Sequence, residues 1–194
     1  MIRPFLGVAL AGVFAITADA QVGGSGWISY SPTKKQDVRG SRATYSNSGG
    51  IETFTIYPGD ERSETRVNNN YTSGWNQFEG QVKVTSGTTG TCVHQVFGGQ
   101  TNATALMVVA HTTSGGDLRR YDSQTLATGV YGVWVRVNTV HDANGNKVSA
   151  YINGSHKGTW DDRGNATHYN KYGVYNISGS KSQTQWKSVK FWRK

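Results

Sequence analysis

The chain has 194 residues, with 20 Lys and Arg against 12 Asp and Glu and a formal net charge of +8. This length suits one domain with a core of its own. Positive residues are scattered without a Lys/Arg cluster, which argues against a nucleic-acid-binding protein. The net positive charge suggests a polyanionic partner, and for a secreted chain an acidic polysaccharide fits best. With 1 Cys the chain forms no internal disulfide, and we expect Cys92 to be a small buried apolar residue.

Residues 1–20 have the pattern of a secretory signal peptide. Arg3 provides a positive start, an apolar run extends from Phe5 to Ile16, and Ala18-Asp19-Ala20 has the small residues of a cleavage site. The run is too short to span a bilayer, and no other stretch approaches spanning length. We therefore predict a secreted, extracellular protein without a membrane partner, in which residues 21–194 form a single domain.

Five tripeptides match the N-glycosylation pattern Asn-x-Ser/Thr. They begin at Asn70, Asn102, Asn153, Asn165 and Asn176. In a secreted chain they predict a eukaryotic glycoprotein.

Short runs of alternating apolar and polar residues, separated by turn residues, indicate β-strands throughout, and no segment has a helical period. Asp142-Ala143-Asn144-Gly145-Asn146 is typical of a hairpin turn. Regular short strands of this kind predict an all-β sandwich. The predicted strands are Glu52–Ile56, Glu64–Val67, Asn76–Val84, Thr91–Phe97, Ala105–His111, Gly132–Val140, Lys147–Asn153, Tyr169–Asn176 and Gln185–Trp192.

The strand at residues 169–176 carries a first candidate site. Side chains alternate between the two faces of a strand, so Tyr169, Lys171 and Tyr175 share one face, with Gly173 between them. Phenols and an ammonium group, beside the space left by a glycine without a side chain, could bind a sugar acid. The alternative is a sheet rim whose tyrosines are exposed because tyrosine fits half-buried strands.

A second candidate is Arg62-Ser63-Glu64-Thr65-Arg66. On a strand Arg62, Glu64 and Arg66 point to one face, and we expect Glu64 to orient both arginines, which remain able to grip an external carboxylate. The alternative is a solvated strand held by salt bridges.

A third candidate is the strand from Cys92 to Gly98. Strict alternation places Val93, Gln95 and Phe97 on one face and Cys92, His94 and Val96 on the other. Gln95 is polar in an otherwise apolar strand, and the alternative is a glutamine with a structural role.

Together the three motifs resemble those of the alginate-lyase superfamily, polysaccharide lyase family seven and its relatives. Arg62–Arg66 is similar to that family's R-(S/T)-E-x-R motif, Gln95–Gly98 to its Q-(I/V)-H-G strand, and Tyr169–Tyr175 to its Y-F-K-x-G-x-Y strand. They occur in the family's order. The resemblance implies a β-jelly roll of two antiparallel sheets, with a concave cleft in which uronate polysaccharides are cleaved by β-elimination.

The sequence departs from the family pattern at one position. Phe97 stands where the family has its histidine, which favours a relationship to glucuronan lyases over alginate-specific enzymes. His111, on the strand predicted to be adjacent, is our first candidate for a substitute. His94 points to the wrong face by parity.

The resemblance implies roles for the remaining residues. Removing the C5 proton of a uronate places negative charge on its carboxylate, which Arg66 and Gln95 would neutralise. Tyr175 occupies the family position of the group that transfers protons, and neighbouring cations such as Lys171 would favour its phenolate. The substrate-binding residues are Arg62, Glu64, Lys171 and Tyr169.

No metal or other cofactor is required by this scheme. The histidines have no metal-ligand spacing, and Asp161-Asp162 alone does not indicate a catalytic ion, although a structural calcium ion stays open. The alternative function is a non-catalytic, lectin-like jelly roll for acidic polysaccharides, and a third is a secreted surface protein that has lost catalysis. Sugar-stacking candidates would be the six tryptophans, most of which we expect in the core. We predict a monomer.

Overall fold

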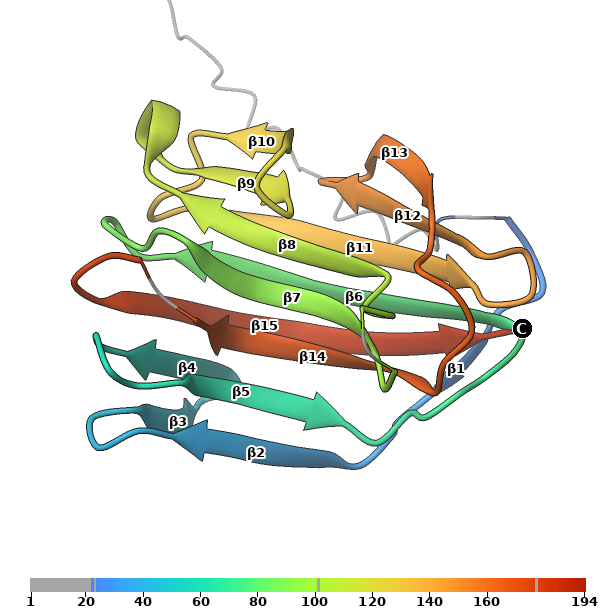
Figure 1. Ribbon diagram of the computed structural model, residues 1–194, viewed down its shortest axis with the longest axis horizontal. Coiled ribbons are helices and arrows are strands. Elements are labelled where there is room, and N and C mark those ends of the chain that lie inside the picture. Colours follow the sequence, from blue (N-terminus) through green and yellow to red (C-terminus); the bar gives the residue numbers. More distant parts are fainter. Residues whose placement is uncertain (1–21, 23, 101, 177) are drawn as a thin grey trace, which may run out of the picture.

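The computed structural model describes residues 22, 24–100, 102–176 and 178–194, which form two antiparallel β-sheets packed face to face (Figure 1). The only helical element within these residues is a 3-10 helix at Thr113–Gly115, so the predicted all-β jelly roll is confirmed. In the same residues no helix is long and apolar enough to cross a membrane. The predicted signal peptide, residues 1–20, lies outside the described residues.

The front sheet in Figure 1 has seven strands in the order β10-β9-β8-β7-β14-β5-β2. Its central strands contain all three sequence motifs, because β5, β14 and β7 are direct neighbours. The bounds are β2 Lys34–Arg39, β5 Arg62–Val67, β7 Thr91–Gly98, β8 Leu106–His111, β9 Asp117–Arg120, β10 Gln124–Thr128 and β14 His168–Tyr175.

The back sheet has the order β13-β12-β11-β6-β15-β4-β3, with β1 paired to β15. The predicted hairpin turn joins β11 to β12, whose register runs from Asp142 opposite Lys147. The bounds are β1 Ile28–Tyr30, β3 Thr44–Ser48, β4 Ile51–Ile56, β6 Trp75–Val84, β11 Trp134–Asp142, β12 Lys147–Ile152, β13 Ser155–Asp161 and β15 Ser182–Arg193.

Each of the predicted strands is present within a few residues of its predicted bounds, whereas β1, β2, β3, β9, β10 and β13 were missed. The missed strands are short or largely exposed, and β2 has the sequence KKQDVR with a single apolar residue. An exposed edge strand gains its hydrogen bonds from a neighbour rather than from burial, so it lacks the alternation that identifies a strand.

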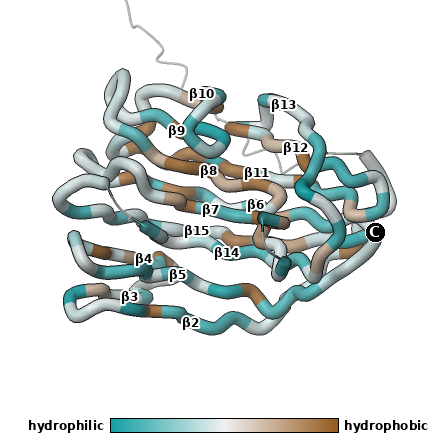
Figure 2. Tube along the Cα trace, in the orientation of Figure 1, coloured by the Kyte–Doolittle hydropathy of each residue, from teal (hydrophilic) through white to brown (hydrophobic). Residues whose placement is uncertain are grey.

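The core fills the space between the sheets. Phe54, Phe78, Tyr172 and Trp186 are fully buried, and the ring centroids of Phe78 and Trp186 are 5.7 Å apart in an edge-on arrangement. The buried phenol of Tyr172 donates to the Glu52 carboxylate at 2.6 Å. Figure 2 shows apolar and hydrophilic residues mixed along the strands, as expected when one face of each sheet packs inward and the other faces solvent.

His94 belongs to this core, so the prediction that it faces away from the candidate site is confirmed. Its ring stacks on Phe78 at 4.0 Å, and its nitrogens lie 3.0 Å from the carbonyl of Lys171 and 3.0 Å from Oγ1 of Thr139. Burial lowers the pKa of His94 from 6.5 to about 3. The ring therefore bridges the two sheets as a neutral group.

We expect His94 to make stability fall on acidification. Above pH 6.5 the ring is neutral in both states, whereas between 6.5 and about 3 the unfolded chain takes up a proton that the folded protein excludes. The resulting loss of unfolding free energy is roughly 4–5 kcal/mol by the time the pH reaches the folded value. Urea unfolding at several pH values would show a smaller acid-dependent loss in His94→Gln than in the wild type.

The control is His156→Gln, which replaces an exposed histidine on β13. Its stability should follow the wild-type pH dependence. Equal acid-dependent losses in wild type and His94→Gln would contradict the assignment.

Candidate functional site

The three motifs meet on the outer face of the front sheet, as predicted. The strand registers align them in rows across the sheet: Gln95, Lys171, Arg66 and Lys35; then Gly173, Glu64 and Asp37; then Cys92, Tyr175, Arg62 and Arg39. Tyr169 lies opposite Phe97 at the end of the grid. Residues far apart in sequence become neighbours here because β5, β14 and β7 are consecutive strands of the sheet.

A register shift in β7 corrects the predicted faces of its first residues. Between Cys92 and His94 the pairing with β8 is irregular, and Val93 is fully buried in the hydrophobic core. Cys92 is therefore opposite Tyr175, on the same side as Gln95, rather than sharing a face with His94. A single inserted residue of this kind reverses strand parity, which strict alternation does not anticipate. Cys92 itself is 3% exposed, so its predicted burial is confirmed.

Gly173 permits a matching irregularity in β14. Its φ is +136°, and a Cβ there would lie 2.5 Å from the carbonyl oxygen of Ser63 on β5. Only glycine accepts this backbone and this close approach. The glycine leaves the middle row without a side chain from β14, so Glu64 lies between Lys171 and Tyr175.

Glu64 is the central charge of the site. Its carboxylate accepts from Nε2 of Gln95 at 2.8 Å and lies 3.5 Å from Nζ of Lys171 and 3.4 Å from Nη1 of Arg62. Burial raises the pKa of Glu64, and Lys171, Gln95 and Arg62 oppose that shift. Glu64 is 2% exposed, so it orients three neighbouring side chains rather than offering surface to a ligand.

The prediction that Glu64 orients both arginines is wrong for Arg66. The Arg66 guanidinium instead donates to Asn68 and, at 3.0 Å, to Asn70, and lies over the ring of Tyr169 at 3.9 Å. Gln95 and Lys171 occupy the positions nearer the carboxylate. Because Gln95 donates to a buried carboxylate, it has the structural role that the sequence left open as the alternative, and its role in a reaction stays a prediction.

Aromatic rings cover the cations at one end of the site. Phe97 and Tyr169 have ring centroids 4.8 Å apart, and Nζ of Lys171 lies 4.8 Å from the Phe97 ring. A phenylalanine therefore holds an ammonium group by its π-face, where the family pattern has an imidazole. It offers no nitrogen for hydrogen bonding or proton transfer.

Tyr175 lies at the other end, beneath a second cation. The Arg62 guanidinium is 4.7 Å from the Tyr175 ring centroid and also contacts Asp37 at 3.5 Å and the carboxylate of Glu61. The contact is a cation–π interaction, in which the guanidinium lies over the ring. Tyr175 is half-buried, so a ligand can reach it.

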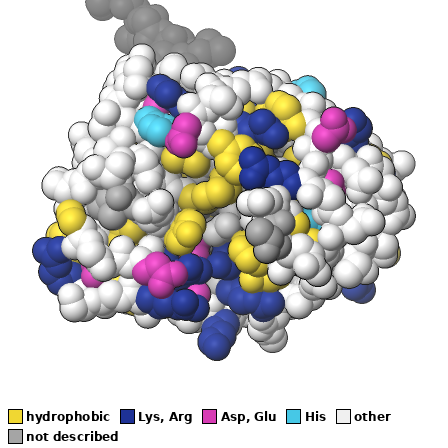
Figure 3. Space-filling model, in the orientation of Figure 1, with side chains coloured by type: hydrophobic (Ala, Val, Ile, Leu, Met, Phe, Trp, Pro, Cys, Tyr) yellow, Lys and Arg dark blue, Asp and Glu magenta, His cyan; other side chains and the backbone are white. Residues whose placement is uncertain are grey.

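A groove of about 380 Å³ lies among these motifs, but neither Gln95, which is 4% exposed, nor Tyr175 is one of its lining residues. Figure 3 shows Lys and Arg side chains gathered over β2 and β5 on this face, with carboxylates among them. The lining residues are Lys35, Asp37, Arg39, Arg62, Arg66, Phe97, Tyr169 and Lys171. The three residues from β2 were missed by sequence reasoning, because an edge strand of mostly charged residues resembles a loop. None of the tryptophans lines this groove.

A larger hollow of about 530 Å³ lies at the end of the sandwich, between residues 28–32, 68–76 and the C-terminus. It contains none of the predicted site residues. The motif-lined groove is therefore the candidate site on chemical grounds, despite its smaller volume.

His111 is not brought into the groove. It lies on β8, the predicted neighbour of β7, but Met107 is the residue of β8 opposite Gln95. His111 is four positions further along the strand, roughly 13 Å away. Its Nε2 lies 3.2 Å from the Asp122 carboxylate instead. Among the described residues, no other histidine replaces the imidazole that Phe97 removes from the groove lining.

Comparison with known proteins identifies the family. A family model described as alginate lyase matches residues 46–193, which include all three motifs.

The chain belongs to the alginate lyase family. Solved structures of alginate lyases share its fold: the marine family 7 enzyme of Zobellia galactanivorans has a TM-score of 0.64 and 17% identity, covering 80% of this chain and 82% of that one. An enzyme from Corynebacterium sp. has a TM-score of 0.60 and 16% identity, covering 77% and 81%.

A relative with higher sequence identity than these structures is not named as a lyase. A citrate-binding protein of Hevea brasiliensis is 37% identical over 163 residues, which cover 77% of this chain and 67% of that protein. This chain thus shares the fold of alginate lyases and is similar in sequence to a protein named for binding citrate.

Proposed function

We propose that the groove binds a uronate-containing polysaccharide and that the protein cleaves it by β-elimination. The observation that supports this most strongly is the convergence of Arg62, Arg66, Gln95, Lys171 and Tyr175 on one face. Cations suited to carboxylates lie beside a half-buried phenol, which can both accept and return a proton.

In the proposed reaction the substrate carboxylate lies near Arg66 and Gln95. Tyr175, as phenolate, takes the C5 proton, the C4–C5 double bond forms, and the bond from C4 to the glycosidic O4 breaks. The proton then passes from Tyr175 to the departing O4, so the phenolate is regenerated. Placing donors where the carboxylate gains charge lowers the barrier, because those donors need no reorganisation during the reaction.

Phe97 bears on the choice of substrate. With phenylalanine at this position, a single tyrosine has to transfer protons on one side of the sugar ring, which restricts the reaction to a syn elimination. The proposed substrate is therefore a uronan whose C5 hydrogen and O4 lie on the same side, and glucuronan is our first choice.

A panel of uronans tests this proposal. Purified protein would be incubated with glucuronan, polymannuronate and polyguluronate, and unsaturated ends would be followed by ultraviolet absorbance. Product from at least one uronan with syn geometry is expected. No unsaturated product from any polymer would refute cleavage.

A second candidate function is carboxylate binding without turnover. The Phe97 substitution and the named activity of the Hevea brasiliensis relative favour it. In this case the groove would hold citrate or a uronate oligosaccharide through the same cations. Calorimetric titration with citrate and with a glucuronate oligosaccharide, combined with the absence of cleavage, would support binding over catalysis.

Arg66→Ala should weaken binding under both candidates. The Arg66 guanidinium is positioned by Asn70 and by stacking on Tyr169, so its loss removes a charge-assisted contact to the ground-state carboxylate. We expect the dissociation constant of a uronate oligosaccharide to rise about 10- to 100-fold. Lys187→Ala on the back sheet changes the net charge equally, and its affinity should match that of the wild type.

We also propose that the protein is secreted and glycosylated. The asparagines of all five sequons are exposed, as glycan attachment requires: Asn70, Asn102, Asn153, Asn165 and Asn176. N-terminal sequencing of the protein secreted by a eukaryotic host should begin at Gln21.

A further inference from the structure

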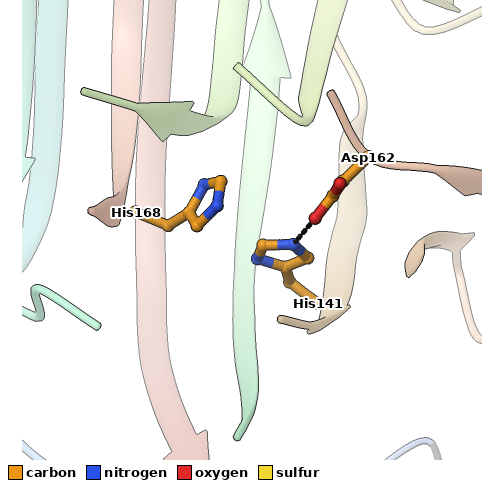
Figure 4. Close-up of side chains that lie close together, drawn as sticks. All are labelled: His141, Asp162 and His168. Carbon is orange, nitrogen blue, oxygen red and sulfur yellow. Dashed lines mark hydrogen bonds and ion pairs between the residues drawn. The ribbon is translucent and has the colours of Figure 1, made fainter. Parts of the chain in front are cut away.

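Three side chains from distant parts of the sequence form a buried cluster at one end of the sandwich. His141 is on β11 of the back sheet, His168 begins β14 of the front sheet, and Asp162 directly follows β13. Figure 4 shows the three turned toward one another, and one potential ligand atom from each lies within 4.8 Å of the others. The side chains of His141 and Asp162 are each 1% exposed, and His168 is 2% exposed.

The hydrogen bonds of the cluster leave one group without a good partner. Nε2 of His141 lies 3.0 Å from Oδ2 of Asp162. Nδ1 of His168 is buried without a hydrogen bond of good geometry to any described residue, although the carbonyl of Phe97 lies beside that ring. Buried polar groups normally have strong partners, so a buried imidazole without a hydrogen bond of good geometry, next to a buried carboxylate, leaves donor atoms that a ligand could use.

We infer that His141, Asp162 and His168 bind a single divalent transition-metal ion of the Zn²⁺ type. Two imidazole nitrogens and one carboxylate oxygen are the donors that Zn²⁺ takes, with a fourth position left for water. Ca²⁺ prefers six to eight oxygens, so the donor set does not suit calcium.

The geometry needs a small contraction to hold the ion. With metal–ligand distances of about 2.1 Å, tetrahedral ligands lie about 3.4 Å apart. The 3.0 Å between His141 and Asp162 is already close to this value, whereas the widest separation in the cluster is 4.8 Å. His168 has to approach by up to roughly 1.4 Å for all three ligands to bind one ion.

Neighbouring groups position each ligand. The Tyr71 hydroxyl lies 2.9 Å from Nδ1 of His141, and such a partner fixes the ring of a metal-binding histidine. Tyr71 also exchanges two backbone hydrogen bonds with His168, at 3.0 and 2.8 Å. Oδ1 of Asp162 accepts from the backbone of Gly164 at 2.9 Å, which leaves Oδ2 directed at the cluster.

The site would connect the two sheets to the groove. The ion would link Asp162, at the start of the β13–β14 connection, to β11 of the back sheet and β14 of the front sheet. His168 immediately precedes Tyr169, and Lys171 follows on the same strand. Bound metal would thus fix the start of the strand that presents two groove-lining residues, Tyr169 and Lys171.

Zinc titration of the full chain, made without a polyhistidine tag and treated with chelator, tests this inference. Calorimetry with ZnCl₂ should give one site per chain, and CaCl₂ should give none. At a hundredfold excess over the dissociation constant, Zn²⁺ should raise the melting temperature by roughly 5–10 °C.

Variants identify the ligands. Asp162→Asn and His168→Gln should each weaken Zn²⁺ binding by more than about 100-fold, and Tyr71→Phe by about 10- to 100-fold. His156→Gln, which removes an exposed histidine, should bind as the wild type does. Asp162→Asn keeps a side-chain oxygen that can form a hydrogen bond with His141, so this variant should fold. It therefore tests the assignment of the metal ligands even if His168→Gln fails to fold.

Two outcomes would overturn the inference. One is the absence of stoichiometric Zn²⁺ binding, which would make the cluster a hydrogen-bonded network only. The other is Zn²⁺ binding that Asp162→Asn leaves unchanged, which would place the ion elsewhere. Neither readout depends on activity, so this test is independent of the proposed lyase function.

Discussion

Replacing Tyr175 with phenylalanine should lower kcat by about 10²- to 10⁴-fold on a cleaved uronan, the range expected when a general acid–base group is removed. The substitution keeps the ring beneath the Arg62 guanidinium, at 4.7 Å from its centroid, and removes only the hydroxyl. Oligosaccharide affinity should therefore change little. Steady-state kinetics from product absorbance, together with calorimetric affinity, would separate the two effects.

Tyr151→Phe is the matched control, because Tyr151 is a half-buried tyrosine on β12 of the opposite sheet. Its turnover should equal that of the wild type. Near-wild-type turnover in Tyr175→Phe would show that another group transfers the proton, and His111→Ala would then be the next variant to measure. If the protein only binds carboxylates, wild type and Tyr175→Phe should have equal affinity and neither should form product.

Replacing Gln95 with alanine should lower kcat by about 10²- to 10³-fold, since a donor to the developing charge is lost. The structure adds a second reason. Nε2 of Gln95 donates to Glu64 at 2.8 Å, and Glu64 also holds Lys171 and Arg62. Losing that donor leaves the buried carboxylate with fewer partners, so the melting temperature should fall as well.

The two contributions of Gln95 can be measured separately. Glu64→Gln removes the carboxylate but keeps Gln95, so it reports how much of the effect comes from positioning. Gln81→Ala, on β6 of the back sheet, is the control for loss of a half-buried amide and should leave kcat unchanged. A Gln95→Ala variant with wild-type kcat would exclude Gln95 from the reaction.

The fold class and most of the candidate site could be predicted from the sequence. Strand alternation is a local property with a period of two residues, so it is readable without knowledge of any neighbour. It correctly placed Tyr169, Lys171 and Tyr175 on one face of β14 and turned His94 toward the core. The resemblance of the three motifs to one family site then implied a shared cleft.

The pairing of those residues, in contrast, depends on how the strands assemble into sheets. The bulge at Val93 placed Cys92 on the same face as Gln95. The register of β5, β14 and β7 placed the Glu64 carboxylate in contact with Gln95, Lys171 and Arg62 and not with Arg66. Register and bulges depend on which strands become neighbours, and no pattern within a single strand encodes that choice.

The cluster of His141, Asp162 and His168 shows the same limit most clearly. The three residues have no metal-ligand spacing in the sequence, because β11, β14 and the residue after β13 belong to different parts of the sandwich. Their ligand atoms come within 4.8 Å only because the two sheets pack face to face at that end. Distances across a sandwich are set by packing of the whole core, so they become visible only once both sheets are in place.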